Sequence, residues 1–417
     1  MKFIHTADIH LDSPLVGLEH YDGAPVAELR SATRKAFVNL VAMAKAEAVS
    51  FVLIAGDIYD GDWRDYNTGL FFAHQMARLS EANIRVFLVR GNHDADSQIT
   101  RELKLPGNVH VFQSRKPETV VCDDLGVAIH GQSFAHQTVT DDLSAAYPVA
   151  IRGLFNIGLL HTSANGREGH ETYAPCAVPG LLTKGYDYWA LGHVHQRETL
   201  AKEPWIVFPG NIQGRHIRET GPKGCDLVTV KDGHVTAIET RALDVARWCE
   251  CVVACAGASD LNDVLDRVRT ALQQVIAKAE DRLVATRVIA RGACRAHGSL
   301  KTQNERFVNE CRALATELGS GRIWVEKALI ETRAAINLDE LAARADPIGQ
   351  LLQYCRQLST DEAAIAELLA EFKDLNQKLP LPIRQGADAL NLNDPQFLRE
   401  LLPEIEQELA PRLLQQE

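Results

Sequence analysis

The stretch FIHTADIHL at residues 3–11 joins a short apolar run to Asp8 and His10, which stand two positions apart. Residues at that spacing in an extended chain point to the same side, so a carboxylate and an imidazole can reach one point. The same pattern, an apolar run that ends in polar side chains, recurs along the first half of the chain. This recurrence decides the expected fold.

Short apolar runs alternate with polar, helix-like stretches through the first ~240 residues. The expected strands lie at residues 3–4, 51–54, 86–89, 127–129, 157–160, 206–208 and 227–230. Strands that alternate with helices predict a layered α/β fold. Ligand sites of open α/β sheets lie at the carboxyl ends of the strands, where this chain places its polar clusters.

The pattern changes twice, which predicts three domains at residues 1–245, 246–340 and 341–417. The middle segment has a strand and helix pattern of its own, typical of a small α/β domain. In the last segment, Asp346 followed by Pro347 is a helix-start signal. Two amphipathic stripes follow, at Ile365–Leu379 and Phe397–Leu409. The sequence therefore predicts a helical C-terminal tail.

Composition narrows the class of protein. The 417 residues carry 44 basic and 55 acidic side chains, a net charge of −11, so DNA binding through the overall field of the chain is not expected. The nine scattered cysteines are expected to be small buried apolar residues of a reducing compartment. The longest apolar run, Val49–Gly56, falls far short of the ~20 residues of a membrane span. We expect no membrane association and a cytoplasmic location.

Four polar clusters and one histidine follow apolar runs in order. They are Asp8-x-His10, Gly56-Asp57-Ile58-Tyr59-Asp60, Gly91-Asn92-His93-Asp94, His161 and Gly192-His193-Val194-His195. A pair of divalent ions needs such a set, with a bridging carboxylate and separate nitrogen and oxygen ligands for each ion. Each cluster alone is also compatible with an ordinary turn or a buried polar residue. Their joint occurrence favours a metal site.

This order of motifs resembles the calcineurin-like metallophosphoesterases, and residues 3–11 resemble the bacterial DNA-repair exonucleases of the SbcD and YhaO type. The motifs cover about the first 225 residues. The resemblance implies a layered α-β-β-α sandwich for residues 1–245. It also implies a small α/β capping domain at 246–340 that is a candidate for DNA contact, and a helical tail at 341–417 that is a candidate for partner docking.

The same resemblance implies roles for individual residues. One metal ion would be held by Asp8, His10, Asp57 and His195, and the other by Asp57, Asn92, His161 and His193. His93 would face the scissile phosphate without binding metal, and Asp94 would orient His93. Asp60 is expected either to fix a ligand or the loop, or to have a plain turn role.

The implied activity is two-metal hydrolysis of a DNA phosphodiester in DNA repair, by an exonuclease, with additional endonuclease activity left open. A hydroxide that bridges two cations is a nucleophile near neutral pH. A protonated His93 can then donate to the leaving 3′ oxygen. Mixed nitrogen and oxygen ligands suit Mn²⁺, iron or Zn²⁺, and the family expectation is two Mn²⁺ ions.

Basic residues in two regions are candidate DNA contacts. Arg167, Arg215 and Lys223 lie in or near glycine-containing loops at the expected rim of the site, where they would contact phosphates or simply be solvated. Arg287 and Arg291 fall on one face of an expected strand, which indicates either a local DNA patch or a solvated sheet face.

Other functions and partners stay open. The same metal site would also serve a small nucleotide or cyclic nucleotide. A scaffold subunit with a vestigial site is a third hypothesis, against which the complete set of ligands argues. The family resemblance implies an SMC-like coiled-coil ATPase as partner, and the tail stripes are candidates for docking on it. Packing of the tail on its own chain, or a homodimer, is the alternative.

Overall fold

The computed structural model describes residues 1–13, 24–60, 66–95, 103–164, 173–319, 321–336, 338–379, 392 and 394–414. The chain divides into two compact units. The first contains 1–250, 276–286 and 319–326, and the second contains 251–275, 287–318 and 327–417.

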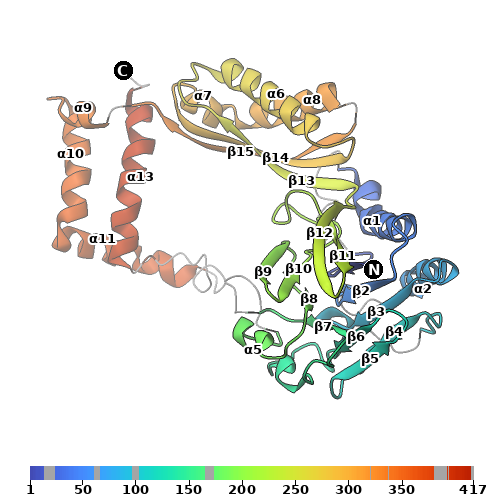
Figure 1. Cartoon of the computed structure of the whole chain (residues 1–417). Coiled ribbons are helices and arrows are strands. Elements are labelled where there is room, and N and C mark those ends of the chain that lie inside the picture. Colours follow the sequence, from blue (N-terminus) through green and yellow to red (C-terminus); the bar gives the residue numbers. More distant parts are fainter. Residues whose placement is uncertain are drawn as a thin grey trace. The chain divides into compact units, whose positions relative to one another are not determined.

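Two six-stranded sheets build the first unit (Figure 1). In spatial order, the first sheet contains β12 (His234–Ala242), β11 (Gly224–Lys231), β1 (Lys2–Thr6), β2 (Phe51–Ala55), β3 (Arg85–Val89) and β4 (Val109–Val111). The second sheet contains β5 (Glu118–Cys122), β6 (Val127–Gly131), β7 (Phe155–His161), β8 (Tyr188–Gly192), β10 (Trp205–Phe208) and β9 (Glu198–Lys202).

Helices connect the parallel strands of the first sheet. The pairs β1–β2 and β2–β3 are parallel, with Phe3 opposite Phe51 and Leu53 opposite Phe87. The crossovers contain α1 (Val26–Ala46) and α2 (Tyr66–Glu81). In the second sheet, β7 and β8 are also parallel. Parallel strands end at one edge of their sheet, so the loops that follow them are brought together.

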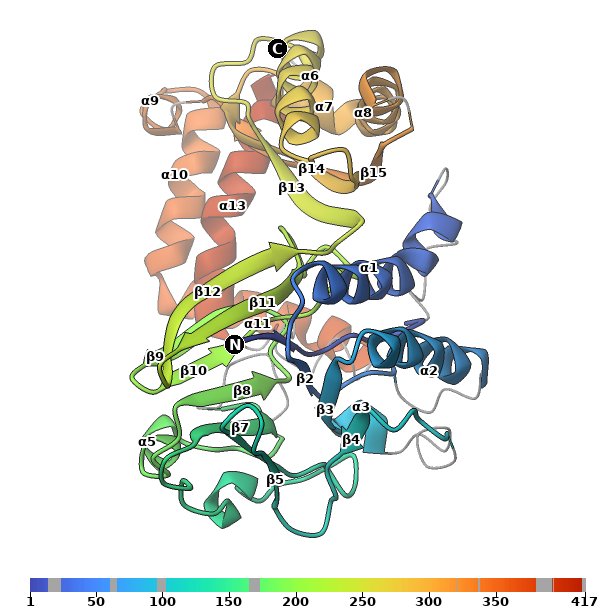
Figure 2. The ribbon, with the colours of Figure 1, turned by 45° about the vertical axis from the view of Figure 1, so that its right-hand side comes forward.

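The apolar strands are buried on both faces, which explains why they read as continuous apolar runs. Phe51 and Leu53 of β2 pack between the two sheets, against residues such as Ile157 and Leu159 of β7. Val52 and Ile54 pack on the other side against residues of α1 and α2. Both helices lie beside the first sheet in Figure 2. A further cluster covers the outer face of the second sheet, where α5 (Val178–Leu182) lies. This confirms the predicted α-β-β-α layering.

A third sheet contains β13 (Ala246–Ala254), β14 (Leu283–Cys294) and β15 (Ile323–Ala334) in that order. The amino-terminal part of each strand belongs to the first unit and the remainder to the second. Helices α6 (Leu261–Ala277), α7 (His297–Thr302) and α8 (Asn304–Gly319) lie on one face of this sheet (Figure 1). The predicted small α/β fold is confirmed, whereas its boundaries at residues 246 and 340 stay predictions.

The tail is helical, as predicted, and its helices pack on one another within the second unit. They are α9 (Leu338–Ala342), α10 (Pro347–Thr360), α11 (Glu362–Lys378) and α13 (Pro395–Leu414). Asp346 caps α10, because its side chain accepts from the Gly349 amide. Ile365 of the first predicted stripe packs against Leu398 and Leu402 of the second. The two stripes therefore pack against each other, although Leu375 is 49% exposed, and this packing is the alternative that the sequence left open.

All nine cysteines have free thiols, and eight of them are buried, as expected for small apolar residues. Among the described residues, the structure contains no helix with the length and apolar character needed to span a membrane.

Candidate metal centre

The candidate residues come together from five strand ends. Asp8 and His10 follow β1, and Asp57 follows β2. The short helix α3 (Asn92–Ala95) follows β3 and carries Asn92 and His93. His161 ends β7, and His193 and His195 follow β8. This placement is consistent with the prediction from the sequence that these side chains lie in one region.

The backbone at the site is strained and tightly held. Asp8, His10, Asp57 and His193 have positive φ angles of 50°, 46°, 53° and 106°. Such conformations cost about 1–3 kcal/mol each in residues other than glycine and concentrate at functional sites. The Asp57 carbonyl accepts from the amides of Ile9 and His10 at 2.8 and 3.0 Å, which ties the loop after β1 to the loop after β2.

Two glycines allow close approach of the ligand side chains. A Cβ atom at Gly91 would lie 2.2 Å from Asp57 Oδ1, and a Cβ atom at Gly56 would lie 2.4 Å from His161 Nδ1. Gly56 also has a φ of +93°, which side-chain-bearing residues rarely adopt. A side chain at Gly56 or Gly91 would overlap with the ligand side chains, so only glycine fits at these two positions.

The first group that can hold a metal ion consists of Asp8, His10 and His195. His195 Nδ1 lies 2.7 Å from Glu219 Oε1, so this nitrogen donates to the carboxylate and leaves Nε2 without a proton in the neutral ring. His195 Nε2 faces His10 Nε2 at 3.2 Å. Two nitrogen lone pairs at this distance repel each other unless a proton or a cation lies between them.

The second group consists of Asp57, His161 and His193. His161 Nδ1 donates to the Ala55 carbonyl at 2.8 Å, which fixes the neutral ring with a lone pair on Nε2. That Nε2 lies 3.0 Å from Asn92 Oδ1 and 3.5 Å from Asp57 Oδ2, and both oxygens are acceptors. Asp57 Oδ2 also lies 3.9 Å from His10 Nε2 of the first group.

The charges and pKa values of the site residues favour the binding of cations. Burial raises the pKa of Asp8, and the charge of Asp57 raises it further. Burial likewise raises the pKa of Asp57. Burial lowers the pKa of His10 well below its usual value and that of His161 to about 3, so both rings are neutral near pH 7. Buried carboxylates and neutral imidazoles that converge are the donor set that divalent transition metals prefer, and a bound cation removes the repulsion.

His93 belongs to a different arrangement. Its Nδ1 lies 3.3 Å from Asp60 Oδ1, and the same oxygen lies 3.5 Å from His10 Nδ1. His10, Asp60 and His93 are a third group close enough to hold an ion. However, one carboxylate oxygen facing two imidazole nitrogens is also the arrangement of an acceptor that orients both rings, and it leaves His10 Nε2 for the first group.

The structure differs from the predicted role of Asp94. We expected Asp94 to orient His93, but Asp94 Oδ1 accepts from the amides of Ile58 and Tyr59, and its Oδ2 accepts from the amide of Gly91. Successive helical residues point about 100° apart, so Asp94 of α3 faces the loop when His93 faces the site. Asp60 is the carboxylate next to His93, and it also lies 3.5 Å from the candidate ligand His10, so a role in fixing a ligand stays a prediction.

Two predicted phosphate contacts lie inside the protein instead of on its rim. The Arg215 side chain is 12% exposed and donates to Glu219, while Lys223 is buried and donates from Nζ to the His195 carbonyl at 2.9 Å. Their placement does not support a direct phosphate contact. Arg167 lies outside the described residues.

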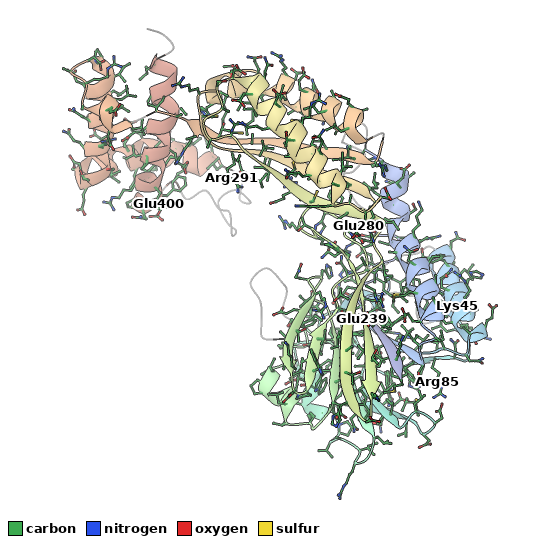
Figure 3. All side chains as sticks on the ribbon, turned by 45° about the horizontal axis from the view of Figure 1, so that its top comes forward. Lys45, Arg85, Glu239, Glu280, Arg291 and Glu400 are labelled. Atoms are coloured by element: carbon green, nitrogen blue, oxygen red, sulfur yellow. The ribbon has the colours of Figure 1, made fainter. Side chains whose placement is uncertain are left out.

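The expected basic face of β14 is partly neutralised. Arg291 (Figure 3) is exposed but donates to Glu331 Oε2 at 2.6 and 2.9 Å, and Arg287 is half-buried. An exposed ion pair of this kind contributes about 0–1 kcal/mol, so it can open at small cost. A DNA contact through Arg287 and Arg291 stays a prediction.

Sequence reasoning missed Glu219, which carries the contact to His195. No strand precedes it directly and no motif surrounds it, so the sequence offered no signal beyond the arginine four positions before it.

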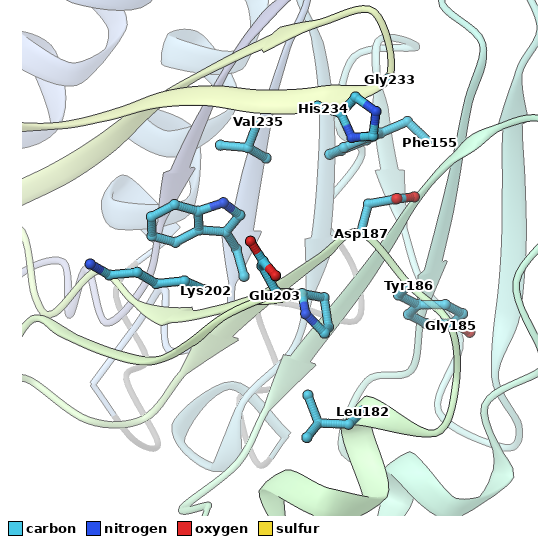
Figure 4. A pocket seen from close by; sticks show the side chains of 12 residues that line it. Phe155, Leu182, Gly185, Tyr186, Asp187, Lys202, Glu203, Gly233, His234 and Val235 are labelled. Atoms are coloured by element: carbon cyan, nitrogen blue, oxygen red, sulfur yellow. The ribbon is translucent and has the colours of Figure 1, made fainter.

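A separate cavity of about 660 Å³ lies at the opposite, amino-terminal ends of β7 and β8 (Figure 4). Its lining includes Phe155, Asp187, Glu203 and Trp205, and none of the candidate metal ligands.

Comparison with known proteins agrees with the geometry. Residues 1–197 match the family model of calcineurin-like phosphoesterases, and residues 248–333 match that of the middle domain of metallophosphoesterase YhaO. The uncharacterized metallophosphoesterase YhaO of Bacillus subtilis is 35% identical over 296 residues, which is 70% of this chain and 72% of that protein.

More distant similarity extends to two archaeal proteins, each named DNA double-strand break repair protein Mre11. The protein from Methanopyrus kandleri is 25% identical, over 51% of this chain and 48% of its own length. The protein from Saccharolobus solfataricus is 24% identical, over 50% of this chain and 52% of its own length. This chain thus spans about half the length of each archaeal relative.

The substitution Asp57→Asn should stabilise the metal-free protein and weaken metal binding. Removing a buried carboxylate next to Asp8 relieves repulsion, so we expect a gain of about 1 kcal/mol in the free energy of unfolding. Bound Mn²⁺ should fall below two ions per chain, as measured by elemental analysis. Asp124→Asn removes an exposed carboxylate that pairs with Arg85 and is the control. Two retained ions in the Asp57 variant would contradict a shared ligand.

Proposed function

Because the chain belongs to the YhaO family of calcineurin-like metallophosphoesterases, we propose that it is a two-metal DNA phosphodiesterase of DNA repair. The observation that carries this proposal is the pair of adjacent His and Asp groups, with Asp57 in the second group and within 3.9 Å of His10 in the first. DNA as substrate is supported by the similarity to the two archaeal repair proteins.

The ligand sets that we propose are those of the family pattern. Asp8, His10, Asp57 and His195 would hold one Mn²⁺ ion, and Asp57, Asn92, His161 and His193 the other. When bound, two such ions supply Lewis acidity at a phosphate and make water acidic near neutral pH. The buried backbone around Asp8 and Asp57 keeps these ligands in place, so little reorganisation is needed on binding.

His93 is the residue that we propose for proton transfer. Its side chain is 34% exposed, in contrast to the fully buried His161, so it can reach a substrate. Its Nδ1 lies 3.3 Å from Asp60 Oδ1, so Nε2 is on the side of the ring away from this carboxylate. In the protonated ring, Nε2–H donates to the leaving 3′ oxygen as the phosphorus–oxygen bond breaks, and the 3′ oxygen leaves as a hydroxyl.

The substrate class is tested with four substrates and added Mn²⁺. We expect the full-length chain to degrade end-labelled linear duplex DNA, with products that shorten over time. Circular single-stranded DNA distinguishes an endonuclease from an exonuclease. Efficient cleavage of cyclic nucleotides and of bis-p-nitrophenyl phosphate without any cleavage of DNA would establish the alternative of a small-molecule phosphodiesterase. Cleavage of none of them would support a scaffold protein.

His93→Ala should separate chemistry from metal binding. We expect kcat on the chromogenic diester to fall by about 10² or more, because the leaving oxygen loses its proton donor, while two ions stay bound. Asp94→Asn offers a comparison, since Asp94 holds loop amides and not His93. Loss of an ion in His93→Ala would instead make His93 a ligand.

The tail is proposed to dock on the coiled-coil ATPase that the family resemblance implies. The stripes at Ile365–Leu379 and Phe397–Leu409 largely cover each other, so the proposal now rests on apolar side chains that stay exposed. Leu351 and Tyr354 of α10 are 36% and 57% exposed and lie three positions apart, on neighbouring turns of one helix.

Replacing Leu351 and Tyr354 with serine should abolish co-purification with that ATPase. Hydrolysis of the chromogenic diester and the content of metal should not change. The control replaces the exposed Gln353 and Thr360, on another side of the same helix, with serine and should keep the partner. Equal retention of the partner by both double variants would rule out this face of α10.

A further inference from the structure

The loop between β10 and β11 holds His195 from several directions. Glu219 Oε1 accepts from His195 Nδ1 at 2.7 Å, and Lys223 Nζ donates to the His195 carbonyl at 2.9 Å. The amide of Asn211 donates to the same carbonyl at 3.4 Å. Residues 211–223 of this loop therefore fix both the ring and the backbone of one candidate ligand.

Glu219 is a saturated acceptor. Its Oε1 accepts from His195 and, at 3.0 Å, from Arg215 NH2. Its Oε2 accepts from Asn211 Nδ2 at 2.9 Å and from the Arg215 amide at 2.8 Å. Burial raises the pKa of Glu219, but the contacts with His195 and Arg215 outweigh burial and hold this pKa far below its usual range. Glu219 is therefore ionised and acts only as an acceptor.

Arg215 links Glu219 to the second orienting carboxylate. Its NH2 lies 3.0 Å from Glu219 Oε1, and its NH1 lies 3.7 Å from Asp60 Oδ2. Asp60 in turn faces His10 Nδ1. One guanidinium thus lies between the carboxylates next to His10 and His195, the two imidazoles whose Nε2 atoms face each other.

We propose that Arg215 and Glu219 are positioning residues that set the ring orientation and tautomer of His195, and that Arg215 joins this contact to Asp60. The proposal rests on the proposed two-metal function, since it assigns these residues to the ion at Asp8, His10 and His195. It replaces the predicted role of Arg215 as a phosphate contact, because both carboxylates already engage the guanidinium.

Loss of the Arg215 charge and loss of its positioning contacts would change the affinity for the cation in opposite directions. Removing a positive charge beside a cation site strengthens cation binding by Coulomb attraction. Removing the guanidinium also frees Glu219 and Asp60 to rotate, and loss of such outer contacts typically weakens metal binding by 10- to 100-fold. Because Arg215 is already paired with two carboxylates, we expect the loss of positioning to dominate.

The experiment titrates Mn²⁺ into the metal-free full-length chain by calorimetry. The wild type should bind two ions. Arg215→Met should retain one ion and bind the other 10- to 100-fold more weakly, and Arg215→Lys, which keeps the charge without the planar fork, should fall between. Arg247→Met is the matched control, because Arg247 is 11% exposed and pairs with Asp244, a carboxylate that faces none of the candidate ligands. It should bind both ions as the wild type does.

Several results would overturn the inference. Unchanged or tighter binding of both ions by Arg215→Met would show that positioning is not the role of this residue, and equal losses in Arg215→Met and Arg247→Met would indicate general destabilisation. If Arg215→Met does not fold, Glu219→Gln tests the proposal instead. An amide must turn its NH2 group toward some of the donors around Glu219, so it cannot accept from all of them. Wild-type affinity in that variant would then refute the proposal. A wild type that binds fewer than two ions would refute the two-metal function itself.

Discussion

His10 and His195 present their Nε2 atoms to each other at 3.2 Å, with the carboxylates of Asp8 and Asp57 nearby. His195 Nδ1 donates to Glu219, so the neutral His195 ring offers only a lone pair there, and two buried carboxylates repel each other. Such a cluster is unfavourable in isolation and becomes favourable when cations lie within it. The strained backbone at Asp8 and Asp57 and the missing side chains at Gly56 and Gly91 all serve to hold these donors together.

Most of the buried strands could be predicted from the sequence, although the fully buried β8 was not among them. Strands such as β2 are apolar at every position because both faces are covered, and such a run is visible without a structure. The edge strands β9 and β12 were missed for the complementary reason. Neither has a buried residue and both contain many polar side chains, so their strand conformation depends on the neighbouring strands β10 and β11.

The residues of the candidate site also fall into those that could be predicted from the sequence and those that could not. Ligands such as Asp8 and His195 follow apolar strands and come in motifs, so their convergence could be predicted from order and spacing. The residues that orient them could not. Asp94 and Asp60 are both carboxylates near His93 in the expected loops, and only the direction of α3 decides which of them faces the ring. Arg215 illustrates the same limit, because a loop arginine has the same sequence signal whether it points to solvent or to a buried glutamate.

An acidic chain can still act on a polyanion when the positive charge is local. Ionic screening limits the reach of exposed charges to about 8–10 Å at moderate salt, so the net charge of −11 is not what a substrate at the site experiences. Two divalent ions would bring about four positive charges to the strand ends, where in-line displacement needs them. Glu219 and Asp60 carry negative charge at the same place, but Arg215 lies between them and offsets part of it. The attraction for phosphate would thus come from the ions, and the chain's own charged residues would serve to keep the ligands in position.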